Sequence, residues 1–502
     1  MDASVNTYGL SQLTQLAQRN NGHSRSKASL VLSIASALAA IAWSTTLIQG
    51  QVAVRNQGYV PFSDAPINYR TAELHDPVAV LQQQLDSGKA SLQYEPEHGY
   101  LRSVLQLLKV PIDSQTLVFS KTSFQYKKIS PDHPRALYFN DDVYVGSVHD
   151  GKAIEIVSFD PLQGAVFYLL DEHKVDKPVF QRAELDCTQC HIAAGTRGVP
   201  GVLLRSIYST TTGTQANSTP SYITDQESPF KERWGGWYVT GKLGSLTSMA
   251  NAAVPDSSDP TSPAISQFAP ASTTKLVALD HAFDPSTYMI PDSDVVAQLV
   301  LAHQTQMHNL ITLTNYKTRI ALYTAATRNK IAGQPADASL PDDLRLQFER
   351  PAEQLLRYLL FVNEAALPGS ASSPITGSST FTQSFAARGV RDANGRSLRD
   401  FDLHTRIFKY SCSYLIYTDS FDQIPEPAKS YIYHRLFEIL TEKDQSPDFA
   451  KISAADKRAI FEILLATKPG LPTEWNDYAR SNHLRVAATP IPRNHPDANQ
   501  PG

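Results

Sequence analysis

Cysteine is scarce in this chain, which has only three among its 502 residues. Three thiols cannot build the disulfide framework that stabilises small secreted domains. Charge is sparse as well, because Lys, Arg, Asp and Glu make up 19% of the residues and the formal net charge is −4. No basic run stands out, so nothing in the sequence favours nucleic acid as a partner. What the chain has is length, enough for about two to four domains.

Two of the three cysteines stand in the motif Cys187-Thr188-Gln189-Cys190-His191. The C-x-x-C-H spacing is typical of c-type haem attachment, in which each thiol forms a thioether bond and the histidine becomes the proximal iron ligand. The motif occurs once, which predicts a single haem c. A zinc half-site, a thioredoxin-like redox pair and chance are the alternatives. The third thiol, Cys412, stands alone among aromatic and apolar residues and is interpreted as a buried core residue.

The N-terminus predicts the compartment. Residues 28–50 contain no charged side chain, and Arg25 and Lys27 precede them. A positive flank followed by an apolar run is typical of an export signal, and this run is long enough to span a bilayer. We therefore expect a hydrophobic helix that anchors the protein on the periplasmic side of the cytoplasmic membrane. Cleavage after Ala42 would instead release an exported protein. Covalent haem attachment is expected outside the cytoplasm, in agreement with this signal.

The remaining pattern predicts an α+β fold, with a β-rich N-terminal part, a c-type haem segment in the middle and a mainly helical C-terminal part. Short aromatic and β-branched runs separated by turns predict an antiparallel meander, with strands at 136–140, 143–148, 153–159 and 165–170. Apolar spacing predicts helices at 77–87, 292–327, 351–363, 431–442 and 454–467. The expected regions are 1–50 (signal or anchor), 51–180 (β-rich), 181–335 (haem-binding), 336–480 (helical) and 481–502 (polar tail).

The expected helix at 292–327 suggests the second axial ligand of the iron. His303 and Met307 lie on its apolar stripe, and His308 lies at the edge of that stripe. Imidazole and thioether groups both serve as axial haem ligands, and His303 is the leading candidate. The alternatives are Met307, His308, Met249 or an open position. A histidine on an apolar face is also commonly a hydrogen-bonded core residue.

Two further segments could support a haem. The carbonyl of Pro200 could accept a hydrogen bond from the proximal imidazole, which would fix its tautomer. Arg233 could pair with a propionate, and the neighbouring Trp234 and Trp237 could exclude water from the macrocycle. The alternative for this Arg-Trp segment is a strand and turn in an ordinary aromatic core.

With these motifs in place, the chain resembles a family of large, exported, single-haem c-type cytochrome proteins. The resemblance covers about residues 58–475 and includes the haem motif and four other stretches: Pro61-Phe62-Ser63, Arg233-Trp234-Gly235-Gly236-Trp237-Tyr238, His303-Gln304-Thr305-Gln306-Met307-His308-Asn309 and Cys412-Ser413-Tyr414-Leu415-Ile416-Tyr417. The family implies haem binding and electron transfer, without a defined substrate.

The sequence therefore predicts a carrier of single electrons, with Cys187 and Cys190 holding haem c and His191 and His303 binding its iron. Its expected partners are a redox protein or a quinone-linked donor, together with the membrane through the N-terminal helix. A second hypothesis is a haem peroxidase or oxidase with an open distal site, using His303 or His308 for proton transfer. A sensing or scaffolding module and a zinc protein built on the three cysteines are the remaining alternatives.

Overall fold

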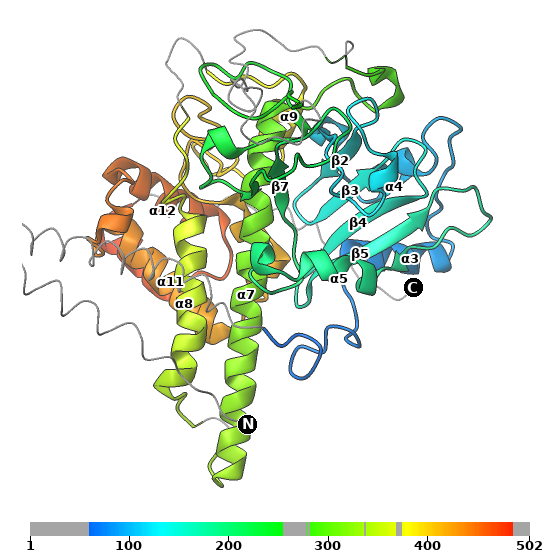
Figure 1. Ribbon diagram of the computed structural model, residues 1–502. Coiled ribbons are helices and arrows are strands. Elements are labelled where there is room, and N and C mark those ends of the chain that lie inside the picture. The colour runs from blue at the N-terminus through cyan, green and yellow to red at the C-terminus, as the bar shows by residue number, and fades with distance from the viewer. Residues whose placement is uncertain (1–59, 255–278, 280–281, 336–337, 368–373, 485–502) are drawn as a thin grey trace, which may run out of the picture. The chain divides into compact units, whose positions relative to one another are not determined.

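Seven antiparallel strands form the larger sheet of the chain, in the order β6-β5-β4-β3-β2-β1-β9 (Figure 1). The computed structural model describes residues 60–254, 279, 282–335, 338–367 and 374–484. The strands of this sheet are β1 (Thr116–Val118), β2 (Arg135–Phe139), β3 (Val143–Ser147), β4 (Ala153–Asp160), β5 (Gly164–Asp171), β6 (Gln181–Arg182) and β9 (Trp237–Tyr238). Two further strands, β7 (Leu204–Ile207) and β8 (Ser221–Thr224), pair with each other.

The predicted meander is confirmed, because β2, β3, β4 and β5 follow one another in the chain and pair in that order. Each expected strand lies within one residue of the observed one at both ends. The turn between β3 and β4 places Asp150 at φ 55° and is closed by a hydrogen bond from Gly151 N to Val148 O of 2.8 Å. Polar turn residues and alternating apolar runs thus carry a strong local signal.

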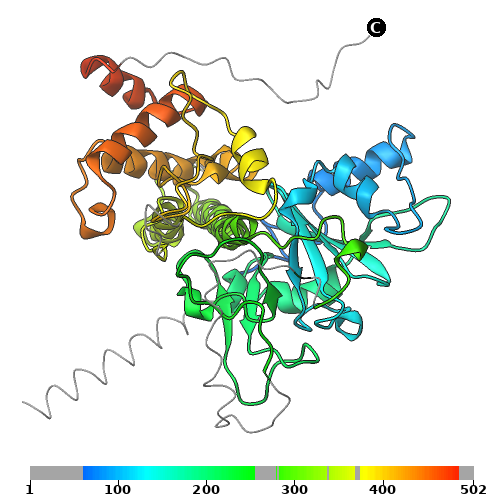
Figure 2. The same ribbon diagram turned by 90° about the horizontal axis from the view of Figure 1, so that it is seen from above.

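The two faces of this sheet pack against different helices. Side chains alternate between the faces along each strand, so Val143, Val145, Ile154 and Ile156 share one face and form a core with α3 (Pro77–Asp86) and α4 (Leu101–Leu107). The other face turns toward α5 (Glu184–His191) and α7 (Val295–Ile331). Figures 1 and 2 show α3 and α4 on one side of the strands and α7 on the other. The haem motif therefore lies on the α7 side of the sheet.

Helix α7 runs through the middle of the described structure. It has 37 residues, and every residue from Val295 to Tyr316 is buried. Its N-cap is Asp294, whose carboxylate accepts hydrogen bonds from the backbone of Val296 and Ala297, so the helix begins three residues after the predicted start at 292. The apolar stripe predicted for this helix does not distinguish a buried face from an exposed one. The sheet, the neighbouring loops and the C-terminal helices enclose α7, so its polar side chains are buried as well.

The C-terminal part is helical, as predicted. Its helices are α8 (Asp342–Leu359), α9 (Phe381–Ala387), α10 (Asp419–Asp422), α11 (Glu426–Leu440), α12 (Ala454–Thr467) and α13 (Thr473–Ser481). Helix α8 begins nine residues before the predicted start at Pro351, which lies inside it. Burial of Leu344 and Phe348 N-terminal to that proline supports the extra turns. Helix α9 is not among the helices that apolar spacing predicted.

The structure corrects the predicted fold class at one point. The α+β organisation, with strands before a helical C-terminal part, is present. However, no helix among the described residues is apolar enough over sufficient length to cross a bilayer, and the expected hydrophobic helix at 28–50 lies outside those residues. Length alone does not suffice, because α7 is interrupted by Gln, His, Thr and Asn throughout. Strand β9, which lies within the expected region 181–335, completes the sheet.

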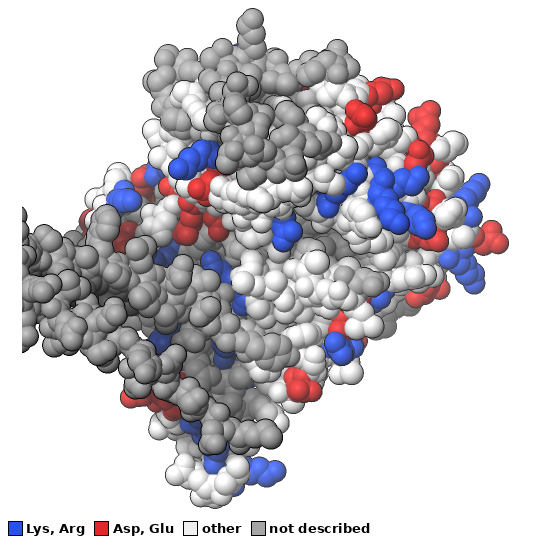
Figure 3. All heavy atoms as spheres, viewed as in Figure 1, with Lys and Arg blue, Asp and Glu red and all other residues white. Residues whose placement is uncertain are grey.

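The described residues pack together as one unit that begins after Gly58. One large core connects Val118 and Phe139 of the sheet with α7, α8 and the C-terminal helices. Lys, Arg, Asp and Glu side chains are interspersed on the face in Figure 3, where neither sign gathers into a continuous field. The polar tail expected from 481 onward lies largely outside the described residues, which end at Leu484.

Candidate functional site

Helix α5 carries both cysteines of the motif and the histidine that follows them. Cys187 and Cys190 are three residues apart, so their side chains emerge from one face of the helix. Cys187 is half-buried against the cluster formed by Phe159 and Phe167, whereas Cys190 is exposed. No disulfide joins any of the three cysteines. The structure thus presents two thiols one turn apart at the edge of an apolar surface.

The imidazole of His191 is held in one tautomer. Its Nδ1 lies 2.9 Å from the carbonyl oxygen of Gly201, and because a carbonyl can only accept, Nδ1 must carry the proton. Nε2 then keeps its lone pair, as a metal ligand requires. Burial, the largest influence, lowers the pKa of His191 below its usual value and favours this neutral form, although the Gly201 bond acts in the opposite direction.

The acceptor is one residue beyond the predicted one. The carbonyl of Pro200 instead accepts a hydrogen bond from Ala165 N on β5, at 3.3 Å. Gly201 also returns its own N–H to the carbonyl of His191 at 3.0 Å, so the two residues are joined twice. The prediction of Pro200 as the acceptor is therefore wrong, and the carbonyl that accepts from His191 belongs to the next residue, Gly201.

Helix α7 holds this loop in place through Asn309. The Asn309 side chain accepts from Val202 N at 3.1 Å and donates to Val202 O at 2.8 Å, which mimics a strand partner. A Cβ on Gly201 would lie 2.1 Å from Asn309 Oδ1, so only glycine fits there. Only glycine therefore fits at position 201. Helix α7 supports the site by holding the loop through Asn309.

A half-buried apolar strip of the sheet lies beside His191. Phe167 has its ring centroid 5.0 Å from that of His191. Phe167 pairs with Val157 across β5 and β4, and Val157 pairs with Tyr144 on β3. Because directly paired residues point to the same face, these three side chains form a continuous surface. Val157 and Tyr144 are only partly buried, which leaves apolar surface next to the motif.

A basic side chain on β2, Arg135, carries a charge that acts on His191. Its guanidinium lies across Gly146, where a Cβ would come within 2.6 Å of Nη2. Arg135 Nη2 pairs with Glu155 at 2.7 Å, but its Nε is buried without a hydrogen-bond partner among the described residues. An unsatisfied buried donor is costly and calls for an anionic or polar partner. Sequence reasoning missed Arg135, because only the sheet register brings it near the motif.

His303, the leading distal candidate, occupies a different environment. Its side chain is fully buried, with Nδ1 2.5 Å from Gln226 Oε1 and Nε2 2.7 Å from Ser413 Oγ. Burial lowers the pKa of His303 to about 3. An iron ligand at His303 would have to give up one of these two hydrogen bonds. The geometry matches the alternative of a core histidine whose polar atoms are satisfied.

The connectivity of Ser413, His303 and Gln226 resembles that of a nucleophile, a base and an orienting amide. All three side chains have 0% exposure, and Ser413 Oγ already accepts a hydrogen bond from Leu415 N. A substrate therefore does not reach the hydroxyl. The network stabilises the contact between α7, α8 and the segment around Ser413 rather than forming a reaction centre.

His308 is the α7 histidine that meets the sheet. Its ring stacks on Phe159 with centroids 3.9 Å apart, and Nε2 lies 2.7 Å from the carbonyl of Asp141. Nδ1 is buried and has no hydrogen-bond partner among the described residues. Met307 and Met249 are buried in apolar surroundings, where Met249 accepts a hydrogen bond from Ser206 Oγ at 3.7 Å. Of these three candidates, His308 alone contacts a residue of the cluster that Cys187 joins.

The Arg-Trp segment belongs to the core. Arg233 is 1% exposed and donates to the backbone carbonyls of Gln226 and Ser228, each at 2.8 Å. Trp234 and Trp237 belong to the large core shared with α7. The alternative of an ordinary aromatic core therefore describes this segment. Arg233 acts by shaping the turn that presents Gln226 to His303.

Comparison with known proteins identifies no relative: no family model, no curated protein and no solved structure matches the chain. Within the described part of the chain, no three His, Cys, Asp or Glu side chains converge to hold a metal ion. Cys412 is fully buried in the core, so a zinc site built on the three cysteines lacks its third ligand. A haem differs from such a site, because its porphyrin supplies four of the iron ligands and the protein supplies only axial ones.

Proposed function

We propose that the protein binds one haem c through Cys187 and Cys190 and carries electrons outside the cytoplasm. The observation that carries the proposal is the arrangement on α5: two thiols on one helical face, followed by an imidazole whose Nδ1 proton is committed to Gly201. A disulfide would not require that tautomer, whereas a metal ligand does.

The surroundings of the motif fit a macrocycle. Phe167 is buried beside His191, while Val157 and Tyr144 on the same face are partly exposed, and burying their remaining apolar surface would stabilise a bound ring by about 25 cal/mol per Å². Arg135 Nε offers a buried donor without a partner, suited to a propionate. His191 would bind the iron through Nε2, and its hydrogen bond to Gly201 would increase its basicity as a ligand.

A bound haem supplies one-electron redox chemistry, and the residues of this chain determine its setting. His191 keeps its proton at Nδ1. The apolar strip of Phe167, Val157 and Tyr144 would exclude water from the porphyrin ring. Low local polarity and the charge of Arg135 would both influence the reduction potential. The expected partner is another redox protein or a quinone-linked donor.

Expression with a haem c maturation system tests the proposal. We expect haem that stays with the polypeptide after denaturation and extraction, in a ratio of one haem per chain. The variant Cys187→Ala/Cys190→Ala should lose it completely. Cys412→Ala is the matched control, because it removes a thiol from the buried core and should retain the full haem content. A wild-type protein without covalent haem would overturn the proposal.

Arg135 gives a second, graded test. Arg135→Met keeps the length of the side chain but removes the donors, so we expect haem to remain attached while the reduction potential shifts. Lys121→Met removes a basic side chain that is not among the charges acting on His191, so it should leave the potential unchanged. If the wild type and Arg135→Met had equal reduction potentials, Arg135 would not be part of the haem site.

The hydrogen bonds of His303 favour one alternative, a haem peroxidase or oxidase with an open distal position. If both nitrogens of His303 stay engaged with Gln226 and Ser413, the iron must take another axial ligand or none. Cyanide binding to the ferric protein distinguishes these cases. A spectrum that cyanide does not change would support the electron carrier, and a shifted one would support the enzyme.

A further inference from the structure

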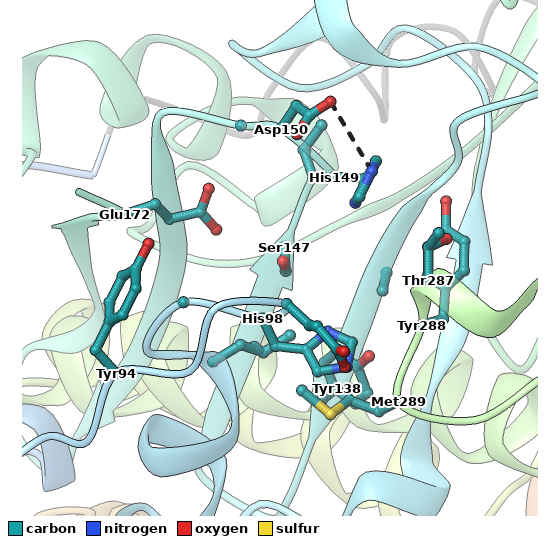
Figure 4. A pocket seen from close by; sticks show the side chains of 16 residues that line it. Tyr94, His98, Tyr138, Ser147, His149, Asp150, Glu172, Thr287, Tyr288 and Met289 are labelled. Carbon is teal, nitrogen blue, oxygen red and sulfur yellow. Dashed lines mark ion pairs between the residues drawn. The ribbon is translucent and has the colours of Figure 1, made fainter. Parts of the chain in front are cut away.

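A cavity of about 190 Å³ lies on the face of the sheet opposite to the haem motif (Figure 4). Its base includes Ala136 and Tyr138, which alternate along β2 with Arg135 and Leu137 and so point the other way. The β3–β4 turn, the segment just before α4 and residues 287–289 form its rim. No residue of α5 lines it, so this cavity is independent of the proposed haem site.

The lining Asp, Glu, Lys and Arg side chains are all acidic, and His98 and His149 line the cavity too, with His149 Nε2 3.9 Å from Asp150. Glu97, Asp150 and Glu172 contribute carboxylates, and neither Lys nor Arg lines the space. Figure 4 shows Glu172 reaching in from the same wall as Tyr94, with Asp150 above it. Among the described residues, no hydrogen bond or ion pair satisfies the half-buried carboxylate of Glu172. Burial, followed by the nearby charges of Glu155, Asp150 and Asp171, raises the pKa of Glu172 to about 7. A cationic ligand would relieve this unfavourable environment.

Aromatic rings form the other walls. The hydroxyl of Tyr138 donates to Gln115 Oε1 and that of Tyr288 donates to the carbonyl of Pro134, each at 2.7 Å. Both rings are therefore fixed, with their polar atoms engaged outside the cavity. Rings at such a site attract organic cations through their faces. Tyr94 already makes such a cation–ring contact within the chain, because the ammonium of Lys174 lies 5.8 Å from the centroid of its ring.

The lining favours an organic cation over a metal ion. No three His, Cys, Asp or Glu side chains in the described part of the chain converge on a point, so a bare divalent ion would lack ligands here. The volume equals that of about six waters, below the roughly 300 Å³ at which pockets for drug-sized ligands begin. It suits a molecule of about six to ten non-hydrogen atoms.

We propose that this cavity binds a small aliphatic amine in its protonated form, with an ammonium group at Glu172 and the carbon chain against Tyr94, Tyr138 and Tyr288. A second ammonium of a diamine would reach Asp150 or Glu97. The site needs no haem, and it assigns a ligand-binding role to the sheet face that the cytochrome function leaves unused.

Titration calorimetry of the full protein with putrescine and spermidine tests this proposal. We expect saturable binding at low salt, with affinity at least tenfold weaker in Glu172→Gln and several-fold weaker in Tyr94→Leu. Asp176→Asn is the matched control, since it removes an exposed carboxylate outside the cavity and should bind like the wild type. The variant Cys187→Ala/Cys190→Ala should also bind equally, which separates this site from the haem proposal.

Three outcomes would overturn the assignment. One is the absence of saturable binding by either amine. Another is equal affinity in the wild type and Glu172→Gln, which would place binding elsewhere. The last is equal binding of 1,4-butanediol, because a neutral molecule of the same length should not bind to a site that recognises charge.

Discussion

Two buried histidines on α7 should determine how this protein responds to acid. His303 and His308 have 0% exposure, and burial lowers their pKa values to about 3 and about 4 respectively. An imidazole in the unfolded chain has a pKa of about 6.5. Between these values the unfolded chain binds protons that the folded protein does not. Their contribution to stability is therefore complete above about pH 6.5 and is lost as the pH falls toward 4 and 3.

The size of the effect follows from the same values. At pH 5.5 each unfolded imidazole binds about 0.9 proton and each folded one almost none. Between pH 7 and pH 5 this linkage lowers the free energy of unfolding by about 2 kcal/mol for each histidine. Three carboxyl groups act in the opposite direction, because burial raises the pKa values of Asp142, Glu172 and Glu364 to about 7. The contribution of the two histidines is therefore obtained from the difference in proton uptake between the wild type and a variant that lacks them.

Proton uptake on unfolding by urea, measured with a pH-stat at pH 5.5, gives that difference. We compare the wild type with His303→Gln/His308→Gln, since a glutamine can accept a hydrogen bond from Ser413 through its amide oxygen, or donate one to the Asp141 carbonyl through its amide nitrogen, without titrating. The wild type should take up about 1.8 protons more per chain. His434→Gln is the control, because the His434 side chain is 58% exposed, in contrast to the two buried rings. A difference below about half a proton would refute the argument, because it would mean that both rings are already open to protons in the folded protein.

Three further outcomes follow from contacts in the structure. Gly201→Ala would force a Cβ against Asn309 Oδ1, so we expect a loss of about 1–3 kcal/mol in thermal unfolding and reduced haem attachment in the same sample; an unchanged melting curve would contradict this. Phe381→Ala should cost about 3–5 kcal/mol, because Phe381 is buried on α9, whereas the half-exposed Phe124→Ala should cost little. His303→Ala should leave the absorption and EPR spectra of the haem protein unchanged, and a changed spin state would restore His303 as an iron ligand.

Regular elements with strong local signals could be predicted from the sequence. The meander and α12, which occupies 454–467 as expected, have turn or cap residues at both ends. The start of α8 could not be found locally, because Pro351 suggested a boundary that burial of Leu344 and Phe348 overrides. Likewise, α9 is stabilised by packing of Phe381 and Phe385 into the core, which composition alone does not show.

The candidate site likewise has one part that the sequence predicts and another that depends on the tertiary structure. By itself, the sequence determined the spacing of Cys187, Cys190 and His191, because adjacent residues on one turn need no distant partner. Only the tertiary structure decided the rest: Gly201 as the partner of Nδ1, Arg135 beside the motif, and His303 engaged on both nitrogens. Gln226 and Ser413 lie 77 and 110 residues from His303. Contacts over such separations depend on sheet register and helix packing, which short-range patterns do not encode.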